Sequence, residues 1–147
     1  MYSVSAMSHL LQPPTSVKLR LCPSSSSPRS STIEFAVLLE QAGASWVTLH
    51  ARHVSARRRR QGAADLDVVR ALKQALRVPV VSNGNVRTWE DVQRNKNETE
   101  VDGIMVGETL LGNPWFVCCS PFPRTASLTT HEQPICECHL GPRSNLP

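Results

Sequence analysis

The residues of this chain that are best suited to chemistry fall into four groups. Each lies within or directly after a short apolar run: Lys18, His50, Asn83-Gly84-Asn85 and Gly107-Glu108. A cation, an imidazole and two glycine loops whose backbone N–H groups can hold an anion suit a phosphorylated aromatic cofactor. These residues are less suited to binding a metal ion, because no cluster of carboxylates accompanies them. The set therefore predicts an anion-binding cofactor site without metal.

Each group also has an ordinary structural explanation when it is considered alone. Lys18 can be a solvated residue of an edge strand, and His50 can be a hydrogen-bonded structural histidine. Asn83-Gly84 can be a simple turn, and Gly107 can relieve backbone crowding. The argument for a site is that all four groups fall in order at the ends of predicted strands.

Strands and helices alternate along the chain, and this order positions the four groups. Alternating or apolar runs predict strands at 16–21, 46–50, 78–81 and 103–106. Apolar stripes at helical spacing predict helices at 32–42, 66–76 and 88–97. Repeated strand–helix units are typical of a parallel sheet, whose strands all end at one edge. We expect an α/β fold, either a doubly wound sheet or a partial (β/α)8 TIM barrel of about four βα units.

Residues at the predicted helix ends support these boundaries. Gly43 has the place of a helix C′ glycine, and Asp65 has that of an N-cap. Thr88 is a second N-cap, and Asp91 three residues later is a near match to a capping box. The Ser- and Pro-rich residues 23–31 predict a flexible loop.

The pattern divides the chain into three regions. Residues 1–15 form an N-terminal flank without a clear period, and residues 16–116 contain the predicted sheet. Residues 117–147 have neither helical nor strand period and are predicted to be an unstructured tail. Since a full barrel needs about 250 residues, a barrel would make this chain about half of one.

The charge of the chain is mildly basic, at +4 from 16 Lys and Arg against 12 Asp and Glu. Much of the excess lies in the run Arg57-Arg58-Arg59-Arg60. Such a block is either a solvated loop or a loop that contacts nucleic-acid phosphates. The composition alone leaves both interpretations open.

The five cysteines predict free thiols rather than a disulfide framework. The start of the chain has no pattern of a signal peptide, and no apolar run reaches the roughly 18 residues of a membrane span. We therefore expect a reducing compartment, the cytoplasm or the nucleus, and no membrane partner. Cys118-Cys119 and Cys136-Glu137-Cys138-His139 match no common zinc spacing, so no metal is predicted.

Five sequence blocks together resemble the tRNA-dihydrouridine synthase family. They are SVKLR (16–20), AGASWVTLHAR (42–52), VPVVSNGNV (78–86), DGIMVGE (102–108) and LGNP (111–114). The blocks follow the family's order and resemble the second half of its FMN-binding barrel. The LGNP block and the His-Ala-Arg run argue against another FMN-dependent barrel oxidoreductase.

The resemblance implies a cofactor, a reaction and a partner. Lys18 and His50 would contact FMN, with the lysine near the flavin ring, and Asn83-Gly84-Asn85 and Gly107-Glu108 would hold its phosphate through backbone amides. The family reduces the C5–C6 double bond of uridine in tRNA, with NADPH as reductant. The substrate base must leave its stack to reach a barrel mouth.

The chain also departs from the family pattern. The family's general-acid cysteine lies on a loop before the lysine strand, and Cys22 is not its counterpart, so we expect no catalytic residue here. From the same resemblance we expect the first barrel half and the C-terminal helical domain to be absent as well, and Ala51 replaces an expected glycine. We expect a truncated fragment that binds FMN weakly or not at all, is inactive alone, and can self-associate through open barrel edges. The alternative is a non-catalytic RNA-binding or non-functional product.

Overall fold

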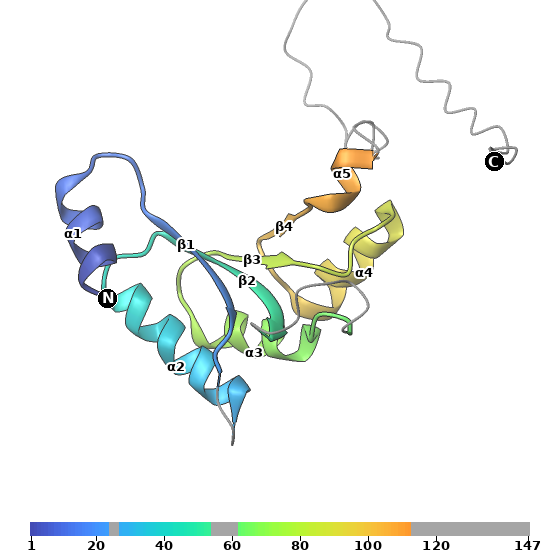
Figure 1. Cartoon of the computed structure of the whole chain (residues 1–147), viewed down its shortest axis with the longest axis horizontal. Helices are drawn as coiled ribbons and strands as arrows, with labels where there is room; N and C mark the ends of the chain where they lie inside the picture. Colours follow the sequence, from blue (N-terminus) through green and yellow to red (C-terminus); the bar gives the residue numbers. More distant parts are fainter. Residues whose placement is uncertain (24–26, 54–61, 113–147) are drawn as a thin grey trace, which may run out of the picture.

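The computed structural model describes residues 1–23, 27–53 and 62–112, and it shows a parallel sheet with flanking helices (Figure 1). The strands are β1 (Ser16–Leu21), β2 (Trp46–His53), β3 (Val80–Asn83) and β4 (Gly103–Met105). The helices are α1 (Tyr2–Leu10), α2 (Pro28–Gln41), α3 (Leu66–Ala75), α4 (Trp89–Thr99) and α5 (Glu108–Gly112). The predicted tail at 117–147 and the arginine run at 57–60 lie outside the described residues.

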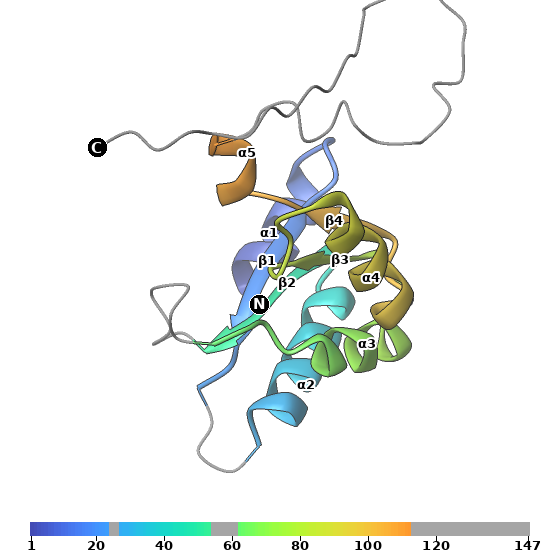
Figure 2. The ribbon, with the colours of Figure 1, turned by 90° about the vertical axis from the view of Figure 1, so that its right-hand side faces the viewer.

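The order of the strands decides between the two predicted architectures. The four parallel strands lie side by side in the sequence order β1-β2-β3-β4. Helices α2, α3 and α4 each connect two neighbouring strands, and Figure 2 shows them together on one side of the sheet. A doubly wound sheet would reverse its strand order and carry helices on both faces. The fold is therefore a partial (β/α)8 TIM barrel, and the doubly wound alternative is wrong.

The two faces of the sheet differ because strand side chains alternate in direction. On the helix side, Val47, Leu49 and Val80 are fully buried and belong to one apolar cluster with Val69 and Leu72 of α3. The residues between them, such as Thr48 and His50, point to the opposite face. Helix packing therefore fixes the register that presents the polar residues on the other side.

Two segments differ from their predicted structure. Residues 2–10 form helix α1, although no period was found there, because this helix buries none of its residues and so needs no apolar stripe. It contacts the end of α2 through Ser8, whose hydroxyl donates to the Ala42 carbonyl at 3.1 Å. Helix α2 begins at Pro28, inside the predicted loop, because proline favours the first helical turn.

The predicted helix caps are confirmed, and one is stronger than expected. Gly43 has a φ of +98° directly after the C-cap of α2, and the Asp65 carboxylate accepts from the amides of Asp67 and Val68. Thr88 and Asp91 form a complete capping box, with both of its hydrogen bonds, where the sequence predicted only a near match to one. An aspartate at this position can reach the N-cap amide as a glutamate would.

Replacing Asp65 with alanine should lower the free energy of unfolding by about 1 kcal/mol, because two amides at the start of α3 lose their acceptor. Denaturant titration followed by circular dichroism measures the change. Asp67→Ala is the matched control, since it removes an exposed charge from the same turn but no cap. Equal losses in the two variants would show that charge at the helix terminus, rather than the cap, is responsible.

Candidate functional site

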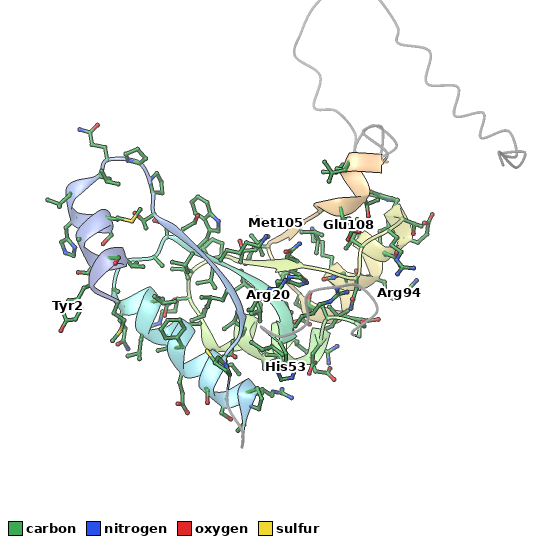
Figure 3. The ribbon with its side chains drawn as sticks, in the orientation of Figure 1. Tyr2, Arg20, His53, Arg94, Met105 and Glu108 are labelled. Carbon is green, nitrogen blue, oxygen red and sulfur yellow. The ribbon has the colours of Figure 1, made fainter. Side chains whose placement is uncertain are left out.

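An open cleft of about 800 Å3 lies at the C-terminal ends of the strands. It is lined by every residue that the sequence singled out for a cofactor: Lys18, His50, Asn83, Gly84, Asn85, Gly107 and Glu108. Figure 3 labels residues at this end of the sheet, with Arg20 and His53 near the ends of β1 and β2, Met105 at the end of β4 and Glu108 at the start of α5. The structure thus brings the four groups together, while their role in binding remains a prediction.

The register of the sheet arranges the polar residues in two rows. One row pairs Lys18 with Thr48, Val81 and Gly103, and the next pairs Arg20 with His50, Asn83 and Met105. Because paired residues of a parallel sheet point to the same face, Arg20 and His50 lie on the face that carries Lys18. The inner face of the barrel therefore becomes cationic toward the cleft.

The charge of this face acts on His50. Burial, followed by the positive charges of Arg20, Arg52 and Lys18, lowers the pKa of His50 below its ordinary value. The ring is therefore neutral at pH 7, and it can donate one hydrogen bond and accept another. Arg52 also lines the cleft, and its buried Nε has no hydrogen-bond partner within the described residues. An anion in the cleft would be attracted by the positive charge of Lys18 and Arg52, which line it.

The Asn83-Gly84-Asn85 loop is held by its own asparagine side chains. Asn83 donates from Nδ2 to the Met105 carbonyl at 2.8 Å, which ties the end of β3 to β4. Asn85 accepts from the Ala64 amide at 2.8 Å and donates to the Ala64 carbonyl at 2.7 Å. Both side chains are thus used within the protein, which leaves the backbone of the loop for a ligand.

The backbone amides around the cleft differ in whether a ligand can use them. The Asp91 carboxylate accepts from the amides of Arg87 and Thr88 at 3.0 and 3.1 Å, so the start of α4 is already capped. In contrast, the amides of Gly84, Asn85 and Gly107 make no hydrogen bond within the described part of the chain. An anion is therefore expected over the glycine loops and not over the helix terminus.

Three residues that shape the cleft were not assigned a role from the sequence. Arg52 lines it, Thr109 donates to the Val86 carbonyl at 2.8 Å, and buried Asn95 of α4 donates to the Gly84 carbonyl at 3.2 Å. Of the three, Asn95 could have been noticed in the sequence, because it is a polar residue at a position where the helix should face the core. Its role depends on a contact across eleven residues that no local pattern reveals.

Other classes of site find no support in the described residues. Within residues 1–23, 27–53 and 62–112, no three metal-ligating side chains form a cluster. No helix in the same part of the chain is long and apolar enough to cross a membrane. Cys22, the one cysteine in these ranges, follows β1 and is not among the residues that line the cleft.

Curated relatives of this chain are tRNA-modifying proteins by name. A probable tRNA-dihydrouridine synthase from Aquifex aeolicus is 39% identical over 77 residues, which cover 52% of this chain and 24% of that protein. The tRNA-dihydrouridine(16/17) synthase, NAD(P)(+)-like, of Rattus norvegicus is 34% identical over 104 residues, which cover 71% of this chain and 23% of that protein. The tRNA-dihydrouridine synthase B of Pasteurella multocida is 31% identical over 114 residues, which cover 78% of this chain and 32% of that protein. The matched region thus spans about a quarter to a third of each relative.

Two further comparisons concern the fold and the family. The structure of (S)-3-O-geranylgeranylglyceryl phosphate synthase from Thermoplasma acidophilum aligns with a TM-score of 0.49 at 22% identity, over 74% of this chain and 45% of that one. The family model described as dihydrouridine synthase (Dus) matches residues 2–139, nearly the whole sequence. The chain therefore belongs to the dihydrouridine synthase family.

Proposed function

We propose that the cleft binds FMN, and that this chain is the flavin-binding part of an enzyme that reduces the C5–C6 double bond of uridine in tRNA with NADPH. Membership of the family supports tRNA as the substrate. We place this enzyme in the cytoplasm or the nucleus. Because the matched region covers about a quarter to a third of the curated relatives, the activity of the whole enzyme is part of the proposal.

The observation that carries the proposal is that all the residues predicted to hold the cofactor line one cleft. Its chemistry fits a phosphorylated planar ligand. Lys18 and Arg52 supply positive charge, and the loop amides of Gly84 and Asn85 supply donors without partners in the described residues. Backbone amides that converge next to cations are a common means of binding phosphate.

Bound FMN would supply hydride transfer to the substrate base. The residues of this chain would bind and orient it. Lys18 is exposed at the wall of the cleft, where its ammonium can offset negative charge on the ligand. Neutral His50 can donate to a ligand oxygen or nitrogen without adding another charge beside Arg20 and Arg52. Cys22, the cysteine within the described residues, does not line the cleft and is therefore not placed to act as the general acid.

Titration of the purified chain with FMN, followed by quenching of flavin fluorescence, tests the proposal. Because the residues expected to hold FMN line one formed cleft, we expect weak but saturable binding rather than none. We expect Lys18→Ala to weaken it further, by about tenfold or more, the effect of one charge-assisted hydrogen bond. Lys96→Ala is the matched control, because it removes the same charge from an exposed position of α4 that does not line the cleft. Absence of saturable binding, or equal losses in both variants, would reject the cleft as a flavin site.

A further inference from the structure

We propose that Asn95, a buried residue of α4, is a positioning residue that turns the Gly84–Asn85 peptide so that its N–H faces the cleft. The inference deepens the proposed function, on which it rests, because the anion received there would be the FMN phosphate. Asn95 itself does not line the cleft and would act only through the loop backbone.

Asn95 is held in one place beneath the loop. Its side chain is 2% exposed, and its Nδ2 donates to the Gly84 carbonyl at 3.2 Å. Thr99, one turn later and fully buried, donates from Oγ1 to the Asn95 carbonyl at 2.6 Å and lies 3.5 Å from Asn95 Oδ1. A buried amide destabilises a fold unless it is hydrogen-bonded, so its bond to Gly84 explains its presence inside the domain.

The direction of one carbonyl determines the direction of the next amide. In a trans peptide the C=O and the following N–H point in opposite directions, and the described chain has no cis bonds. Because the Gly84 carbonyl points down to Asn95, the Asn85 amide points away from α4. This amide makes no hydrogen bond within the described residues, and Asn85 lines the cleft.

The loop conformation is one in which this peptide could turn over. Gly84 has a φ of +117° and Asn85 a φ of +58°, and a peptide flip between two residues separates common turn types. A flipped peptide would present the Gly84 carbonyl to the cleft, where it would repel an anion. Asn95 holds the carbonyl from below, while the two bonds between Asn85 and Ala64 fix the residue that follows.

The test compares FMN with riboflavin, which lacks the phosphate. Asn95→Leu keeps the number and branching of the side-chain heavy atoms, carries no charge and removes the donor to Gly84. We expect it to weaken FMN binding about tenfold while riboflavin binding stays within twofold of the wild-type value. Thr32→Val is the structural control, since it removes a buried hydroxyl from α2, which does not line the cleft, and it should leave the ratio of the two affinities unchanged.

A second measurement does not require flavin binding. In 1H–15N NMR spectra, we expect titration with inorganic phosphate to shift the Asn85 amide resonance of the wild type but not that of Asn95→Leu. The inference would be overturned if phosphate left the wild-type Asn85 amide resonance unshifted. It would also be overturned if Asn95→Leu had the wild-type ratio of FMN affinity to riboflavin affinity. A phosphate-dependent Asn85 amide in a protein that binds no FMN would instead reject the proposed cofactor and keep the role of Asn95.

Discussion

Replacing Gly84 with alanine should lower the affinity for FMN by about a hundredfold, because the loop must move away from its cradle geometry. A Cβ at this position would lie 3.0 Å from the Ala64 Cβ and 3.3 Å from His50 Cδ2, and the φ of +117° disfavours any side chain. The resulting shift would misplace the neighbouring amides, and the loss of two charge-assisted hydrogen bonds corresponds to about that change in affinity. Isothermal titration calorimetry with FMN measures the effect.

Gly62→Ala separates backbone strain from steric contact. Gly62 also lines the cleft and has a φ of +102°, but a Cβ there would meet nothing within 4 Å. We expect this variant to be destabilised by about 1 kcal/mol from strain and to keep most of its FMN affinity. Equal loss of affinity in both variants would show that strain alone, and not the contact with Ala64 and His50, governs the loop.

Replacing Asp102 with alanine should lower the free energy of unfolding by about 2–3 kcal/mol, because a buried backbone amide loses its acceptor. The Asp102 carboxylate accepts from the Val80 amide at 2.7 Å, and Val80 is fully buried. The same carboxylate forms an ion pair with Lys73 at 2.8 Å, but the 42% exposed aspartate side chain makes that contribution small. Denaturant unfolding at neutral pH measures the change.

Asp102→Asn tests which of the two interactions stabilises the fold. An asparagine oxygen still accepts from Val80, so this variant should lose only the ion pair, about 0.5 kcal/mol. A loss as large as that of Asp102→Ala would assign the stability to Lys73 instead.

Acid unfolding gives an independent measure of the same carboxylate. The hydrogen bond from Lys73, followed by that from the Val80 amide, lowers the pKa of Asp102 below its ordinary value of 3.8. A carboxylate whose pKa is lower in the folded state stabilises the protein above its unfolded pKa and loses this effect as the pH falls below it. The free energy of unfolding should therefore fall less steeply below about pH 4 in Asp102→Asn than in the wild type.

Local patterns in the sequence determined the βα units and most helix ends. Apolar stripes and caps depend on residues three or four positions apart, so Asp65, Thr88 and Gly43 could be placed without a structure. The same reasoning missed α1 and the start of α2. Neither α1, which buries no residue, nor the Ser-rich start of α2 carries an apolar period to be detected.

The sequence by itself also predicted a set of residues that gather in the cleft. All parallel strands end at one edge, so Lys18, His50 and the two glycine loops were expected to lie there together, and they line one cleft. Only the tertiary structure decided that the strands follow one another in order, with helices on one face, and that the start of α4 is closed by Asp91. It alone also revealed Asn95 beneath Gly84 and Asn85 across from Ala64. These contacts join residues 11 and 21 positions apart, and their geometry comes from helix and strand packing rather than from any local preference of the chain.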